Sequence, residues 1–246
     1  MSKLKNMVGK IFPTNNGGDC IVVEYINAKK VVVKFLGDFP CEVTVEAGAL
    51  RKGEVKNPCF PSLCGVGFVG MGIYKTTHKG KPLEVYKRWK GMTERCYGKK
   101  TKANCYSSCS VSKEWHNFQN FAEWYTKQEF QGEGYHLDKD LLKKGNKVYS
   151  EENCCLIPSV INSLLVSPSY NGDYPQGVTY HKRTKRFAAR VQRNGRNFHV
   201  GHYSTPEEAF VEYKVAKEKH VKNVAAEWEG LISSKVYKAL MNWTVE

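Results

Sequence analysis

The chain has 246 residues, 41% of them hydrophobic and 12% aromatic, and this composition excludes a disordered or low-complexity protein. Lys and Arg number 38 against 24 Asp and Glu, giving a formal charge of +14 at pH 7. No apolar run approaches the roughly 20 residues of a membrane helix, and the first residues lack the apolar stretch of a secretory signal. We therefore expect a basic intracellular protein of mixed α+β class, with several domains and no membrane association.

The first third of the sequence predicts short strands. β-Branched runs cover residues 19–26, 30–36 and 41–46, and glycines separate them. Several short strands with tight turns favour a small SH3-like β-barrel over residues 1–72, whose role stays open. The Gly- and Pro-rich stretch Cys59–Gly72 is predicted to be a loop.

The middle of the chain, residues 73–168, changes to helical spacing from Leu83, and Trp89, Trp115 and Trp124 are expected in its core. The remaining predicted elements of this part are a strand over Tyr135–Leu142, a loop, a strand over Asn153–Pro158 and a short helix from Ser159.

The last third predicts a sheet followed by helices. Its strands are Gly177–His181, Arg186–Arg193 and Asn197–Tyr203. A helix should begin after Thr205, because Pro206 and Glu208 complete a capping box. We assign residues 172–222 to this domain, and residues 223–246 to a helical tail with one helix over Lys222–Gly230 and another after Ser234.

Basic residues gather in these C-terminal strands. From Tyr174 to Tyr203 there is no acidic residue and there are seven basic ones, namely Lys182, Arg183, Lys185, Arg186, Arg190, Arg193 and Arg196. Because side chains alternate across a strand, Arg186, Ala188 and Arg190 should share one face, with Phe187, Ala189 and Val191 on the helix side. Such a face suits phosphates and base edges; the alternative is a merely solvated basic face.

The segments Gly177-Val178, Arg186–Val191, Gly195–Tyr203 and Thr205–Phe210 closely resemble the DNA-binding domain of the APETALA/ethylene-response-factor family. The resemblance implies a three-stranded sheet that enters the major groove of double-stranded DNA, backed by a helix. It makes Arg186, Arg190 and Arg196 the foremost DNA contacts. Thr179 stands where many plant members have Arg, so the plant target sequence is not implied.

A second group of polar residues lies in the middle of the chain. His136, Asp138 and Asp140 occupy alternate positions of a predicted strand and would share one face. Asn153 and Asn162 bracket the next strand. Carboxylate, imidazole and carboxamide groups together suit a hard divalent cation and a water, as phosphodiester hydrolysis requires. The alternative is a solvated turn and two ordinary helix caps.

The stretch Trp89–Leu165 resembles the phage branch of the HNH endonucleases, whose ββα-metal core has the same strand–loop–strand–helix order. In that family one Asn precedes the second strand and an Asn or His follows nine residues later, the spacing of Asn153 and Asn162. The resemblance implies a homing-type endonuclease that cuts double-stranded DNA in the cytoplasm of a bacterial host. Asp138 and Asn162, with Asp140 as a further candidate, would bind Mg²⁺ or Mn²⁺, and Asn153 would order the loop.

The position of the family's general base holds Lys139 instead of His. His136 could serve as the base, Lys139 could serve with a lowered pKa, or the site could be inactive. We favour His136, because lysine is a poor base unless its pKa is depressed. An inactive site would leave a non-catalytic DNA-binding regulator, and RNA binding is a third, weaker hypothesis because the sheet lacks a pair of stacking aromatic residues. We favour a monomer.

The sequence contains nine cysteines. Cys96, Cys109 and Cys154 could converge with Cys105 or His116 on a structural Zn²⁺. Buried thiols in a tryptophan-rich core are the favoured alternative.

Overall fold

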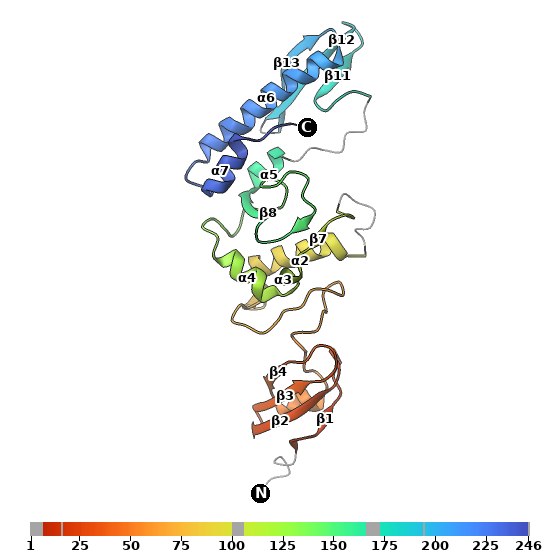
Figure 1. Ribbon diagram of the computed structural model, residues 1–246, viewed down its shortest axis with the longest axis vertical. Coiled ribbons are helices and arrows are strands. Elements are labelled where there is room, and N and C mark those ends of the chain that lie inside the picture. Colours follow the sequence, from red (N-terminus) through yellow and green to blue (C-terminus); the bar gives the residue numbers. More distant parts are fainter. Residues whose placement is uncertain (1–6, 16, 100–105, 166–172, 194, 246) are drawn as a thin grey trace. The chain divides into compact units, whose positions relative to one another are not determined.

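The structure is a computed structural model that describes residues 7–15, 17–99, 106–165, 173–193 and 195–245. Within these residues it contains several sheets and seven helices, which confirms the predicted mixed α+β class (Figure 1). None of the described helices is both long and apolar enough to cross a bilayer. The contacts divide the chain into two units: unit 1 has the described residues up to Lys127 plus Lys147–Ser150, and unit 2 has the rest.

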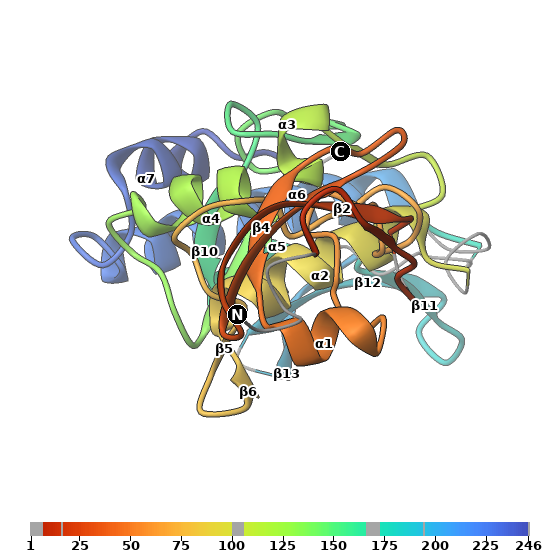
Figure 2. The same ribbon diagram turned by 90° about the horizontal axis from the view of Figure 1, so that it is seen from below.

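Unit 1 begins with a four-stranded antiparallel sheet. Its strands, in spatial order, are β1 (Ile11–Phe12), β2 (Cys20–Asn27), β3 (Lys30–Phe35) and β4 (Glu42–Val45). The predicted barrel is not closed within the described residues, because the two-residue strand β1 pairs only with β2 and leaves β4 as the other edge. Helix α1 (Ala47–Arg51) follows β4 directly (Figure 2). Val22, Val31, Val33, Phe35 and Leu50 form the core.

The second part of unit 1 is helical with an aromatic core. Its elements are β5 (Thr77–His78), β6 (Lys81–Pro82), α2 (Glu84–Tyr97), β7 (Ser110–Val111), α3 (Lys113–His116), α4 (Phe118–Thr126) and β9 (Val148–Tyr149). Trp89, Trp115 and Trp124 are buried as predicted, and the Trp89 indole N–H donates to the carbonyl of Trp115 at 2.7 Å. A break separates α3 from α4 because the side chain of Asn117 accepts the Gln119 N–H and caps α4.

Unit 2 begins with two antiparallel strands and a helix. Strand β8 (Tyr135–Asp138) pairs with β10 (Cys155–Pro158), and α5 (Ser159–Leu165) follows β10 without a gap. The strand predicted to reach Leu142 ends at Asp138. There the carboxylate accepts the backbone N–H groups of Asp140 at 2.9 Å and Leu141 at 2.7 Å, which turns the chain out of the strand.

The last part of unit 2 is the predicted sheet with its helices. The elements are β11 (Val178–His181), β12 (Arg186–Arg193), β13 (Arg196–Tyr203), α6 (Pro206–Glu227) and α7 (Ser234–Met241). The capping box of Thr205 and Glu208 is present. The separate helix predicted over Lys222–Gly230 is wrong, because α6 continues through Lys222 as one helix of 22 residues (Figure 1).

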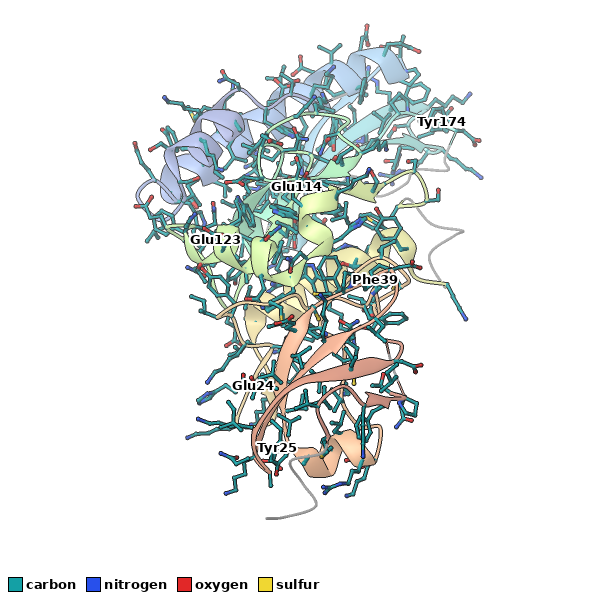
Figure 3. All side chains as sticks on the ribbon, turned by 60° about the horizontal axis from the view of Figure 1, so that its bottom comes forward. Glu24, Tyr25, Phe39, Glu114, Glu123 and Tyr174 are labelled. Carbon is teal, nitrogen blue, oxygen red and sulfur yellow. The ribbon has the colours of Figure 1, made fainter. Side chains whose placement is uncertain are left out.

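Helix α6 covers one face of this sheet. Ala189 and Val191 of β12 are fully buried with Ala209 and Tyr213 of α6. Tyr174 lies beside the sheet (Figure 3) and contacts the rings of Tyr180 and Phe187. The later turns of α6 pack instead with α5, β10 and α7, in a core that includes Ile161, Val221 and Leu240. The same helix therefore supports both the sheet and the β8–α5 region.

Candidate functional site

The β8–α5 region brings two predicted site residues into contact. His136 on β8 is paired with Ile157 on β10, and Asn162 lies one turn into α5. The Asn162 Nδ2 and His136 Nδ1 atoms are 3.4 Å apart, so the carboxamide and the imidazole share a weak hydrogen bond. Both side chains are half-buried. The pair joins residues that are 26 positions apart in the sequence.

Asp138 lies on the same face of β8 as His136, two residues further along the strand. Burial raises the pKa of its carboxyl group, and Asp140 adds to this, while hydrogen bonds from the Leu141 and Asp140 amides and the charge of Lys139 act in the opposite direction. The turn uses Oδ1 as its acceptor. A carboxylate in this position keeps further lone pairs with which it can bind a cation.

Lys139 has a structural environment unlike that of a general base. Its side chain is buried, and Nζ lies 2.7 Å from both carboxylate oxygens of Asp140. Nζ also donates to the carbonyl of Asn146 at 3.2 Å, and the Asn146 side chain donates back to the Lys139 carbonyl at 2.9 Å. These contacts, which we call the Lys139 clasp, close the loop from Lys139 to Asn146. Asp140 is held in the clasp beyond the end of β8, and not on the strand face with His136 and Asp138.

Sequence reasoning missed Asn146. Its side chain is buried, and its two hydrogen bonds to Lys139 fix the loop that follows Asp138. The available signal was Gly145-Asn146, a dipeptide typical of a turn, with Gly145 at φ +71°. The predicted loop residue Asn153 lies half-buried in the turn before β10.

The candidate zinc ligands occupy different environments. Cys109 and Cys154 are buried, Cys96 is half-buried, and Cys105 lies outside the described residues. The His116 ring contacts the ring of Tyr97, with centroids 5.8 Å apart. Among the residues that the structure describes, no group of three or more His, Cys, Asp or Glu side chains is arranged to hold a metal ion.

The basic sheet has two chemically different faces. Phe187, Ala189 and Val191 point toward α6, as the alternation predicted. The opposite side, which we call the outer face, carries Arg186 and Arg190, both exposed. Lys182, Arg183 and Lys185 are exposed in the turn between β11 and β12.

Two of the predicted DNA contacts lie on the other side of the sheet. Arg193 and Arg196 are cross-strand partners and share the face of Val191. The Arg193 guanidinium lies 5.4 Å from the centroid of the Phe198 ring on that face. Arg193 and Arg196 are therefore not placed beside Arg186 and Arg190.

Three histidines share the outer face with the two arginines, and sequence reasoning missed them. In the register, His181 pairs with Arg186, His199 with Arg190, and His202 with Ala188. The ring centroids of His199 and His202 are 4.4 Å apart, and those of His181 and His202 are 5.9 Å apart.

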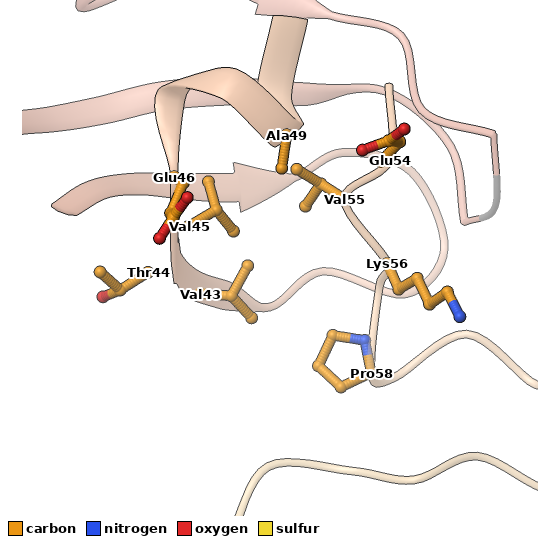
Figure 4. Close-up of a pocket in the computed structure, with 9 residues that line it drawn as sticks. All are labelled: Val43, Thr44, Val45, Glu46, Ala49, Glu54, Val55, Lys56 and Pro58. Carbon is orange, nitrogen blue, oxygen red and sulfur yellow. The ribbon is translucent and has the colours of Figure 1, made fainter. Parts of the chain in front are cut away.

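Two hollows are lined mostly by residues outside these groups, although Arg190 lines the second. The first, of about 470 Å³, lies beside β4 in unit 1 and is lined mainly by Val43, Val45, Ala49, Val55 and Pro58 (Figure 4). The second, of about 530 Å³, lies between α5, α6 and the edge of β12. Lys217 lines it and donates from Nζ to the Leu164 carbonyl at 2.8 Å, and burial lowers the pKa of this lysine. Neither hollow is lined by His136, Asp138 or Asn162.

Comparisons of the chain with known protein families, with curated proteins and with solved structures found no significant match.

Proposed function

We propose that the chain is a metal-dependent endonuclease of the homing type that hydrolyses phosphodiester bonds in double-stranded DNA. The observation that carries the proposal is the contact between His136 and Asn162, with Asp138 on the same face of β8. A base, a carboxylate and a carboxamide are the groups that a ββα nuclease site needs, and they come from the strand and helix that the resemblance indicated. The outer face of the C-terminal sheet would dock on the duplex through Arg186 and Arg190.

The donor set fits a hard divalent cation. Asp138 and Asn162 offer a carboxylate and a carboxamide oxygen, which Mg²⁺ and Mn²⁺ accept readily. When bound there, such an ion would stabilise the charge that develops on the phosphate and on the leaving oxygen. Asp140 is the weaker candidate ligand, because both of its carboxylate oxygens lie 2.7 Å from Lys139 Nζ.

His136 is the residue that we assign as general base. The carboxamide oxygen and nitrogen of Asn162 exchange places by a half-turn about χ2. With Oδ1 toward the imidazole, Nδ1–H donates to it, and Nε2 is then the nitrogen that accepts a proton from water. Oδ1 has a second lone pair for a cation. Asn162 can therefore both orient His136 and bind the ion.

The test is cleavage of supercoiled plasmid with Mg²⁺, with Mn²⁺ and with EDTA. We expect nicking or linearisation that depends on the metal and is lost in Asp138→Ala and Asn162→Ala. Asp38→Ala and His78→Ala, two exposed substitutions in unit 1, should cleave like the unmodified protein. An unchanged rate in Asn162→Ala would refute the metal assignment.

A second candidate, a DNA-binding regulator without catalysis, is favoured by one observation. Lys139 stands where the resemblance places the general base, and it is buried in the clasp. Tight binding of duplex DNA without cleavage in the presence of either ion would support the regulator.

A further inference from the structure

The arrangement of histidines on the outer face depends on a local irregularity of the sheet. In a regular strand, residues three apart point to opposite faces. Here Ala189 pairs with Gly201 while Arg190 pairs with His199, so Val200 is the extra residue of a β-bulge in β13. The bulge reverses the alternation and turns His199 and His202 to the same side. Their ring centroids therefore lie 4.4 Å apart on the exposed surface.

The surroundings of this cluster are cationic. The groups that act on His202 are His181 from β11, Arg186 and Arg190 from β12, and His199 from its own strand. Desolvation, followed by the charges of these four neighbours, lowers the pKa of His202. The lowered pKa favours the neutral form of this imidazole in the unbound protein, although it lies within a strongly basic surface.

We propose that His181, His199 and His202 belong to the DNA-contacting surface and engage phosphates in their protonated form, so that binding of duplex DNA takes up protons. The inference rests on the proposed function, because it assumes that the outer face meets the duplex. A phosphate placed against this face would oppose the positive charges that lower the pKa of His202. Each proton taken up then adds a cation to the interface at the moment when an anion arrives.

Two consequences can be measured. The first is that affinity rises as the pH falls, since a complex that binds more protons than its components is favoured by acid. The second concerns salt. Each additional protonated histidine that neutralises a phosphate should steepen the dependence of log K on log salt concentration by about 0.9. A histidine that is only a bystander would change neither quantity.

The experiment is fluorescence anisotropy of a short labelled duplex, titrated with the full chain in EDTA. We expect binding to tighten by about threefold or more between about pH 8 and about pH 6, with a steeper salt dependence at the lower pH. In the double variant His199→Gln and His202→Gln, both differences should shrink toward zero. His78→Gln, which changes an exposed histidine on β5, should retain both.

The outcomes separate the inference from the function on which it rests. No binding of duplex at either pH would overturn the DNA-docking function itself. Binding that is tight but independent of pH would overturn the inference and leave the function standing. The inference would also fail if the double variant kept the full pH and salt effects of the unmodified chain. Circular dichroism at both pH values would confirm that each variant remains folded.

Discussion

The β8–α5 site and the outer face of the sheet hold their histidines by different means. His136 contacts a partner 26 residues away, and the contact exists because β10 and α5 pack with α6 and α7 in a buried core. His199 and His202 are three residues apart, and one bulge in β13 brings them together. The first site therefore depends on tertiary packing, whereas the second depends on the local path of one strand. Substitutions should distinguish the two sites. Changes at the β8–α5 site should lower the cleavage rate, whereas changes on the outer face should weaken docking on the duplex.

The largest expected effect is on cleavage. His136→Gln removes the proposed base and should lower the rate of plasmid cleavage by about 10²–10⁴-fold, the range for loss of a positioned acid–base group. Duplex affinity measured in EDTA should stay the same, because His136 is not on the basic sheet. A variant that lost affinity in proportion to rate would indicate that the two sites are not separable. Lys139→Arg is the matched control. It keeps the positive charge of the clasp and leaves His136 in place, so the rate of plasmid cleavage should be retained.

The next prediction concerns the two faces of the sheet. Arg190→Ala should weaken duplex binding by about 1–3 kcal/mol, whereas Arg196→Ala should weaken it less, because Arg196 shares the face of Val191 and α6. Both substitutions remove one positive charge from the same strand pair, so net charge cannot explain a difference. Equal losses of affinity would contradict the assignment of the outer face as the docking surface.

Lys139→Met tests whether Lys139 has a structural role. The substitution leaves the Asn146 carbonyl without its Lys139 donor and breaks the ion pair with Asp140. We expect the free energy of unfolding to fall by about 1–3 kcal/mol, discounted because the Asp140 side chain is 54% exposed. Urea unfolding measures this change. If Lys139→Met abolished cleavage while stability stayed constant, Lys139 would be the base and His136 would not.

The sequence predicted the strands and helices of the chain better than it predicted the contacts among their side chains. Alternation and capping signals identified β12 and the start of α6, because they depend on residues within one turn or one strand. The open sheet of unit 1 depends on the shortness of β1, which composition does not reveal. The Lys139 clasp depends on the path of a loop. The histidine cluster depends on a bulge that reverses the alternation of side chains along β13. Features that depend on the path of a loop or on a register shift were therefore not predicted.

The smallest expected effect is on the pH dependence of stability. Because burial raises the pKa of Asp138, the folded state holds this proton at a pH where the unfolded chain has released it. Ionisation of Asp138 therefore reduces stability as the pH rises from about 4 toward the folded-state pKa.

Asp138→Asn removes this contribution to the pH dependence, while its carboxamide oxygen can still accept the N–H groups of Asp140 and Leu141. We expect a variant that is inactive in cleavage yet no less stable than the unmodified protein at neutral pH. Urea unfolding of the variant and of the unmodified protein, on both sides of this pH range, measures the difference in stability. A large loss of stability at neutral pH would mean that the Asp138 charge itself holds the turn, and that the carboxylate is there for structure and not for a metal ion.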